Sequence, residues 1–386
     1  MPARRSPSSR RRRNLLLGAL AAFVLGGIAG AKSGGEDSRP AARDDAPAPA
    51  PVAGSDRPAA VDRLTLREQV GQLILLRFAG TTPPGYVRAA LRGRRAAGVI
   101  LFRDNAGAPA QLRALTSRLR RAGGRPVVAV DQEGGAIRIL PWAPPVASAP
   151  QQARAGSVRS DAEAAARALR AAGITVSLAP VGDVPSVAGA ALAGREFSSD
   201  PGAAGDAMAA AVSGWRAGGV AATAKHFPGL GGATVNTDDG PATIMRSRTR
   251  LAATDLPPFV AAIRAGVPLV MVGHARYPAL DRERIASQSS TIVEGLLRER
   301  LGFRGVVVTD SMEAQASLAT GTVETASERA VRAGADLVLL TGQGSYAPVY
   351  AHLLALARRS APFRSRVRQS AARVLALKAR GARAPR

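Results

Sequence analysis

Short apolar runs recur along the chain and alternate with longer stretches rich in alanine, leucine and arginine. The runs are apolar throughout, instead of at every second residue, which is typical of parallel strands buried on both faces. We predict eight strands, near residues 70–76, 98–102, 126–130, 174–178, 220–224, 267–272, 305–308 and 335–340. Helices are predicted between them, near residues 109–122, 161–172, 201–217, 257–265 and 292–301.

This alternation predicts an α/β fold with a parallel sheet covered by helices. Eight strand–helix units in roughly 320 residues fit a single closed (β/α)8 barrel of the TIM type. We assign the barrel to residues 62–382 as one catalytic domain. In this fold the C-terminal ends of the strands build the active site, so the residues that end each run are the candidates for chemistry.

Polar or ionisable residues end five of the predicted strands. Asp131 ends the third, and Asp183 lies beyond the fourth. The fifth run stops at Lys225 and His226, which are followed by Phe227-Pro228-Gly229, and the chain has only three lysines and three histidines. His274 and Asp310 end the sixth and seventh runs. Solvated strand ends explain one or two such residues, whereas five converging on one mouth favour a catalytic site.

The composition narrows the chemistry. With 46% apolar residues the chain can bury one large core, and it contains no cysteine. This excludes disulfides, thiolate zinc sites and a cysteine nucleophile. The three histidines, His226, His274 and His352, include no pair with metal-ligand spacing, so we predict neither a metal nor another cofactor.

The N-terminus is typical of a targeting segment. Six arginines within residues 4–13 precede residues 15–31, which carry no charge. We predict that residues 1–32 are a secretory signal peptide or an uncleaved membrane anchor, and that residues 33–61 are a disordered Pro/Ala-rich linker. Either interpretation places the globular part outside the cell or at its surface. A membrane contact through the N-terminal segment is expected only if the segment is uncleaved, and the oligomeric state is left open.

A net charge of +25 is typical of proteins that bind nucleic acid, but much of this positive charge lies near the two termini of the chain. The signal region holds six arginines, and the part after Asp336 holds ten Lys or Arg and no acidic residue. Apolar residues at helical spacing within residues 363–379 predict a basic amphipathic helix that caps the barrel. The chain has no nucleic-acid motif and few aromatics for base stacking, so no nucleic-acid partner is predicted. Attraction to anionic wall polymers or lipid headgroups remains a hypothesis.

Several motifs, in order, resemble those of family 3 glycoside hydrolases. The resemblance covers roughly residues 62–345 and is closest to the single-domain bacterial β-N-acetylhexosaminidase branch. Its motifs are Asp131-Gln132-Glu133-Gly134-Gly135, Gly194-Arg195-Glu196-Phe197, Lys225-His226-Phe227-Pro228-Gly229, Met271-Val272-Gly273-His274 and Gly305-Val306-Val307-Val308-Thr309-Asp310. It implies a (β/α)8 barrel and a retaining hydrolase that forms a covalent glycosyl-enzyme intermediate.

By this resemblance Asp310 is the nucleophile, a role that suits a carboxylate held at a strand end beneath an oxocarbenium-like transition state. Asp131, Arg195, Lys225 and His226 match positions that hydrogen-bond the sugar hydroxyls, and we include His274 among the substrate-binding residues. The implied substrate is terminal β-linked N-acetylglucosamine, with cell-wall glycan fragments as the source.

Two departures from the family pattern affect these assignments. Where the branch has an Asp-x-His pair as general acid/base, this chain reads Asn236-Thr237-Asp238-Asp239, which makes Asp238 the candidate proton donor and Asp239 the alternative. Where the family has a sugar-contacting arginine, this chain has Ile139, and Arg138 is one residue out of phase.

Three other functions remain open on the sequence. The first is a catalytically weakened barrel that binds carbohydrate or cell wall, and the second is a β-glucosidase or β-xylosidase of the same family. The third is an aldolase that uses Lys225 as a Schiff-base lysine, although Asp310 would then have no role.

Overall fold

The computed structural model describes residues 60–383. The predicted signal or anchor (1–32) and all of the predicted linker up to residue 59 lie outside the described residues. Ala60 and Val61, predicted as the end of the linker, belong to the 3-10 turn η1 (Ala60–Arg63), and Val61 is buried. The described fold therefore starts two residues before the predicted domain boundary.

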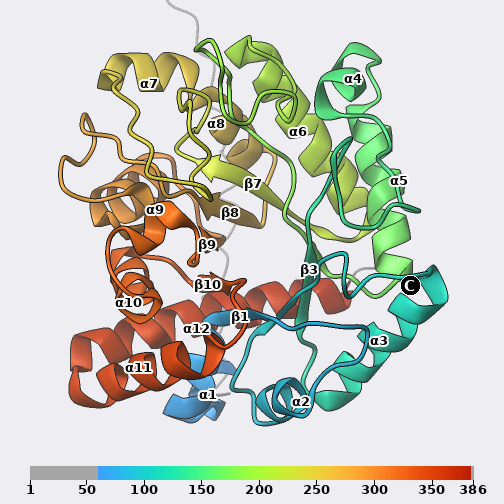
Figure 1. Cartoon of the computed structure of the whole chain (residues 1–386), viewed down its shortest axis with the longest axis vertical. Helices are drawn as coiled ribbons and strands as arrows, with labels where there is room; N and C mark the ends of the chain where they lie inside the picture. The colour runs from blue at the N-terminus through green and yellow to red at the C-terminus, as the bar shows by residue number, and fades with distance from the viewer. Residues whose placement is uncertain (1–59, 384–386) are drawn as a thin grey trace, which may run out of the picture. The chain divides into compact units, whose positions relative to one another are not determined.

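Eight parallel strands close into a barrel in the order β1-β10-β9-β8-β7-β6-β3-β2, which confirms the predicted fold class (Figure 1). The strands are β1 (Ile74–Arg77), β2 (Gly98–Ile100), β3 (Val127–Val130), β6 (Val176–Ser177), β7 (Ala221–Phe227), β8 (Leu269–Val272), β9 (Val306–Ser311) and β10 (Leu337–Leu340). A two-stranded hairpin, β4 (Gln132–Gly134) and β5 (Ile137–Arg138), follows β3 at the mouth of the barrel and was not predicted.

The helices before and between the strands are α1 (Leu66–Gly71), α2 (Gly85–Arg92), α3 (Pro109–Ala122), α4 (Ala149–Arg154), α5 (Val158–Ala171), α6 (Pro201–Gly218), α7 (Arg248–Thr254), α8 (Pro257–Arg264), the 3-10 turn η2 (Ala286–Gln288), the π-helix η3 (Thr291–Arg300), α9 (Gln315–Leu318) and α10 (Val323–Ala333). The first predicted strand began too early, because Val70 lies in α1. Thr65 caps this helix in a capping box with Glu68, a polar signal that outweighs the apolar side chain of Val70.

Two C-terminal helices, α11 (Tyr346–Arg359) and α12 (Ala361–Arg383), complete the fold. In Figure 1, α12 (red) runs beside α11, and it also contacts β9. Val374 and Leu377 of α12 pack into the same apolar cluster as the inward-facing strand residues, such as Leu75 and Val306. The C-terminal helix therefore caps the barrel, as predicted, at the end opposite the strands' C-termini. No helix within residues 60–383 is long and apolar enough to cross a membrane.

Candidate active site

The mouth of the barrel is built by strand alternation. Side chains at every second residue point inward, and Ala129, Ala221 and Val308 belong to the apolar cluster inside the barrel. Continuing this alternation places Asp131 and Asp310 one step, and Lys225 two steps, beyond these residues, at the C-terminal ends of β3, β9 and β7. A pattern of apolar residues thus positions three ionisable ones at a common opening.

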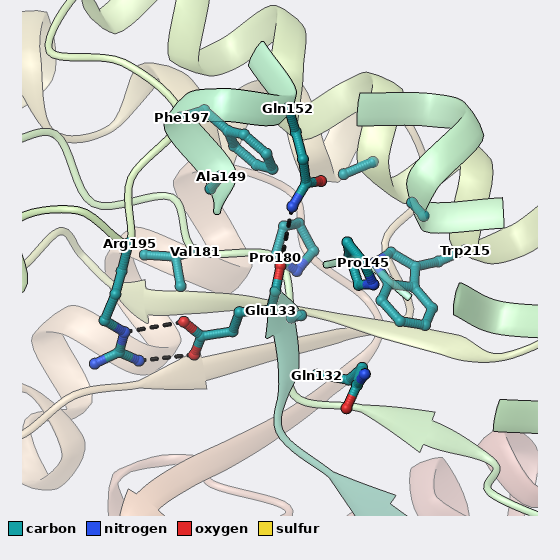
Figure 2. Close-up of a pocket in the computed structure, with 13 residues that line it drawn as sticks. Gln132, Glu133, Pro145, Ala149, Gln152, Pro180, Val181, Arg195, Phe197 and Trp215 are labelled. Atoms are coloured by element: carbon teal, nitrogen blue, oxygen red, sulfur yellow. Dashed lines mark hydrogen bonds and ion pairs between the residues drawn. The ribbon is translucent and has the colours of Figure 1, made fainter. Parts of the chain in front are cut away.

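Lys225 lies between two carboxylates at this mouth. Its Nζ is 2.5 Å from Asp131 Oδ1 and 2.7 Å from Glu133 Oε1. Arg195 binds Glu133 in a two-pronged pair, with Nε 2.9 Å from Oε2 and Nη2 2.7 Å from Oε1 (Figure 2). These four residues, the Lys225 cluster, carry two positive and two negative charges, so the buried lysine is fully compensated.

The pKa shifts of Glu133 and Lys225 both favour the ionised form of these groups. Burial alone would raise the pKa of Glu133, but the charge of Lys225 and the hydrogen bonds of Arg195 lower it to about 2. Burial would lower the pKa of Lys225, and the charges of Asp131 and Glu133 instead raise it above its ordinary value. A lysine held protonated in this way donates hydrogen bonds and is not the neutral amine that Schiff-base chemistry requires.

His226 is oriented by a buried carboxylate. Its Nδ1 donates to Asp183 Oδ2 at 2.7 Å, while Asp183 Oδ1 accepts from the backbone N–H of His226 and of Leu230. His226 Nε2 then lies 3.9 Å from Asp310 Oδ2. A register shift against β8 between Ala224 and Phe227 interrupts the alternation of β7, so both Lys225 and its neighbour His226 reach the site.

Asp310 lies in β9 with its side chain largely buried and accepts a hydrogen bond from the backbone N–H of Ser311 at 2.8 Å. Burial alone would raise the pKa of Asp310, but His226, His274 and this N–H together lower it below its usual value. The carboxylate is therefore ionised over the ordinary pH range, as a nucleophile must be.

His274, predicted to be a substrate-binding residue, contacts the backbone beside Asp310. The ring is fully buried, and Nε2 donates to the carbonyl of Ser311 at 2.7 Å while Nδ1 lies 2.8 Å from Ser287 Oγ. Both ring nitrogens are thus engaged by the protein. His274 fixes the peptide of Ser311, whose N–H binds Asp310.

Asp238 and Asp239 lie in the long connection between β7 and α7, and both are exposed. The carbonyls of Thr237 and Asp238 accept from the N–H groups of Ala316 and Gln315 in α9, which follows β9. Asn236 Oδ1 accepts from the N–H of Asp238, forming a local turn. These backbone hydrogen bonds hold the loop of the candidate proton donor against α9, next to the end of β9.

The electrostatic field at the mouth distinguishes Asp238. Although Asp238 is exposed at the rim, the protein around the mouth reduces the solvation of its carboxyl group. This desolvation and then the nearby Asp310 carboxylate raise the pKa of Asp238, while His226 and His274 act in the opposite direction. One carboxyl group at the mouth is thus pushed toward the protonated form and another toward the ionised form.

Ile139 follows the hairpin strand β5 and packs against the apolar core, and its N–H donates to the carbonyl of Asp131. Arg138 pairs with Gln132 in the β4–β5 ladder, out of phase with Ile139. The position beside Asp131 therefore offers a hydrocarbon surface instead of a cation.

Glu133 and Arg195 also line a small cavity. Figure 2 shows it between Gln152, Phe197 and Trp215, where it encloses only about 10 Å³. This is room for one water molecule, so the cavity is not a sugar site.

Two functional residues escaped the sequence-based site list. The sequence places Glu133 in a motif and Asp183 at a strand end, but it indicates no role for either residue. Both act through other side chains, so only the packing shows that Glu133 binds Lys225 and Arg195 and that Asp183 orients His226. Within residues 60–383 no group of three or more His, Asp or Glu residues is arranged to hold a metal ion.

Comparison with known proteins adds independent information. Residues 65–377 match the family model described as the glycosyl hydrolase family 3 N-terminal domain. A β-hexosaminidase of Xanthomonas oryzae pv. oryzae is 36% identical over 280 residues, which covers 69% of this chain and 83% of that protein.

Solved structures of two proteins are also similar. A β-N-acetylhexosaminidase from Beutenbergia cavernae has a TM-score of 0.76 and 34% identity, covering 82% of this chain and 99% of that one. A family 3 β-N-acetylglucosaminidase from a Paenibacillus species has a TM-score of 0.77 and 33% identity, covering 83% of this chain. The match spans 63% of that longer protein.

Proposed function

This chain belongs to glycosyl hydrolase family 3, and we propose that it is a retaining hydrolase that removes terminal β-linked N-acetylglucosamine. Asp310 is the nucleophile and Asp238 the general acid/base. The observation that carries the proposal is the pair of carboxyl groups at one mouth whose pKa values are shifted apart, that of Asp310 downward and that of Asp238 upward. Such a pair supplies an anion for attack and a proton for the leaving group.

In the first step, a carboxylate oxygen of Asp310 attacks the anomeric carbon while the bond to the glycosidic oxygen breaks. Protonated Asp238 gives its proton to that oxygen, and the aglycone leaves as an alcohol. In the second step, Asp238 takes a proton from water, the resulting oxygen nucleophile attacks the anomeric carbon, and the bond to Asp310 breaks. Free sugar leaves, and both residues return to their starting states.

The Lys225 cluster and His226 hold the sugar. Lys225 and Arg195 are fixed donors, Asp131 is a fixed acceptor, and His226 Nε2 reaches toward Asp310. Groups held in place before binding orient a polyol for in-line attack without reorganisation during the reaction. Support for N-acetylglucosamine as the sugar comes from the names of the similar proteins.

Water, and not inorganic phosphate, is the acceptor in this proposal. A carboxylate at position 238, next to the ionised Asp310, repels a phosphate dianion from the anomeric centre. Faster turnover in phosphate buffer, with a sugar 1-phosphate as product, would contradict this assignment.

Cell-wall glycan fragments outside the cytoplasm are the proposed natural source of substrate. The arginine-rich start and the uncharged residues 15–31 support export, by cleavage or as an anchor. Fractionation of cells that produce the full chain, followed by N-terminal sequencing, tests both points. A full-length protein recovered from the cytosol would oppose them.

Hydrolysis of p-nitrophenyl β-N-acetylglucosaminide, β-glucoside and β-xyloside tests the catalytic assignment. We expect turnover of the first substrate, loss of activity in Asp310→Ala, and a decrease of roughly 100-fold or more in Asp238→Ala, with Asp239→Ala as the matched control. Azide should restore Asp238→Ala and yield the β-glycosyl azide.

Two results would contradict the assignment. If Asp239→Ala is the impaired variant, the acid/base is misassigned. Sugar binding without turnover of any of the three substrates would identify a catalytically weakened carbohydrate-binding barrel instead.

A further inference from the structure

The base of the barrel, opposite the catalytic mouth, contains the larger of the two described pockets. It encloses about 270 Å³ where the N-terminal ends of β8 and β9 meet α12. The floor is apolar, with Phe303, Val306 and Leu377. Arg304, Arg373 and Arg380 line the same pocket. Hydrocarbon and guanidinium groups in one pocket suit a ligand that is both apolar and anionic.

Two of these arginines, together with Arg264 beside the pocket, are exposed and unpaired. Arg264, Arg304 and Arg380 make no hydrogen bond or ion pair with any other residue in the described part of the chain. Arg264 ends α8, where a cation also stabilises the helix dipole. Arg304 lies in a loop and has no such role. These three residues, the base arginines, are free to bind an external anion.

The connections at the base carry exposed charge of one sign only. The eight connections from a helix into a barrel strand contain a single acidic residue, Asp336. Asp336 is fully buried and is bound by Arg298, Arg366 and Arg373, so it presents no negative charge to the outside. The mouth, by contrast, carries Asp131, Asp238, Asp239 and Asp310. The connections at the base therefore expose only positive charge, whereas the mouth carries charges of both signs.

The start of the described chain lies against α12. Asp62 of η1 binds Arg368 of α12, so residues 1–59 precede a point next to this helix. That preceding sequence includes residues 15–31, which carry no charge and have the composition of a membrane-inserting segment. A soluble polyanion would use the arginines but would leave the apolar floor of the pocket without a function.

We propose that the base of the barrel docks onto a bilayer that contains anionic phospholipid, with a lipid headgroup and the upper part of its acyl chain in the pocket. The base arginines bind the phosphate, and α12 lies along the surface. In this orientation the catalytic mouth faces away from the bilayer, toward external glycans.

Vesicle sedimentation tests the proposal with a protein that begins at Asp56, which retains every packed element of the barrel. We compare phosphatidylcholine vesicles with equal mixtures of phosphatidylcholine and phosphatidylglycerol at about 0.1 M salt. We expect binding to the anionic vesicles only. The triple variant Arg264→Glu, Arg304→Glu and Arg380→Glu should bind at least tenfold more weakly.

The matched control changes the net charge equally at the other end. Arg250→Glu, Arg282→Glu and Arg284→Glu alter exposed residues in the connections after β7 and β8. This control should bind like the unmodified protein. If both triple variants bind the vesicles equally weakly, binding depends only on net charge and the proposal is overturned. Equal binding of the unmodified protein to both vesicle types would also overturn it. The protein could instead bind linear polyphosphate more tightly than vesicles, and vesicles could fail to displace the polyphosphate. That result would identify a soluble polyanion as the ligand of the base and overturn the proposal.

Orientation provides a second test, since the chain has no cysteine of its own. A polarity-sensitive dye is placed on Ala376→Cys, in the pocket wall, or on Met245→Cys, an exposed residue after β7. Anionic vesicles should shift the emission of the first dye to shorter wavelength and leave the second unchanged. A shift at Met245→Cys alone would place the mouth on the bilayer and overturn the orientation.

Discussion

At the scale of single residues, the buried charges of the site are each compensated by a partner of opposite charge. Asp131 and Asp310 could be located from the sequence, since each continues the inward-facing alternation of a strand. Glu133 could not, because its partners Lys225 and Arg195 are distant in sequence and only the fold joins them. His274 lies at a strand end and binds the backbone of Ser311, so a polar residue at such a position can also hold its neighbours in place.

The first prediction concerns the pH dependence of kcat/KM. The proposed mechanism requires Asp310 to be ionised and Asp238 to be protonated. Because the pKa of Asp310 is lowered and that of Asp238 is raised, activity falls at low pH as Asp310 gains its proton and at high pH as Asp238 loses its own. The profile should be a bell that extends both below and above the ordinary carboxyl range.

Initial rates with the N-acetylglucosaminide across pH 3–9 check this profile. In Asp238→Ala, a substrate with a good leaving group should keep the acid limb and lose the alkaline limb. An alkaline limb that survives in this variant would show that another group supplies the proton.

The second prediction concerns Glu133→Gln. The pKa of Glu133 is lowered from 4.5 to about 2, which corresponds to about 3 kcal/mol of stability at neutral pH. A lowered carboxyl pKa stabilises the fold above pH 4.5, and this contribution is lost as the pH falls toward 2. Glu133→Gln should therefore reduce the free energy of unfolding by about 3 kcal/mol at pH 7 and raise KM.

Urea unfolding at pH 7 and at pH 3 measures this effect, with Glu299→Gln as the control because Glu299 is exposed and unpaired within the described residues. The difference between Glu133→Gln and the unmodified protein should shrink at pH 3. A constant difference at both pH values would mean that the lost stability is not electrostatic.

At the scale of elements, the strand–helix alternation was sufficient to predict all eight barrel strands and the C-terminal cap. Continuous apolar runs identify strands that are buried on both faces. The β4–β5 hairpin was missed because its residues, Gln132–Gly134 and Ile137–Arg138, are few and polar. Their conformation depends on tertiary contacts, such as those of Gln132 with the carbonyls of Leu140 and Ala143.

The third prediction concerns the attachment of α12. Asp336 precedes β10 and accepts hydrogen bonds from Arg298 of η3 and from Arg366 and Arg373 of α12. Asp336→Asn leaves these buried cations without their anion, which should reduce the free energy of unfolding by about 3–5 kcal/mol. KM should not change, since Asp336 lies at the end of the barrel opposite the mouth.

Chemical denaturation and steady-state kinetics on the same samples test this separation of stability from binding. Asp206→Asn, an exposed position on α6, is the control and should match the unmodified protein. An increase in KM without loss of stability in Asp336→Asn would show that the base and the mouth are coupled.

At the scale of the whole molecule, the two ends of the barrel carry different kinds of residues and have different proposed roles. The mouth holds acidic groups for chemistry, whereas the base holds arginines and the apolar contacts that close the fold. Net charge alone could not reveal this division, because +25 is a sum over the chain. The strand order resolves it by assigning each connection to one end.

This division predicts opposite results for truncations at the two termini. Removing residues 1–55 should leave the melting temperature and kcat on a soluble substrate unchanged, since every strand and the closing pair β1–β10 lie within the described residues. Removing residues 361–386 should prevent folding. That segment buries Phe363, Val367, Val374 and Leu377, which contribute about 6–12 kcal/mol at 1.5–3 kcal/mol each.

A loss of this size equals the whole stability of a typical domain, about 5–15 kcal/mol, and it also exposes Asp336. Circular dichroism and thermal melts of the two truncated proteins provide the measurement. A folded, active protein without α12 would mean that the barrel closes without its cap. In that case the apolar cluster of Leu75, Val306 and Leu337 would tolerate solvent at the base.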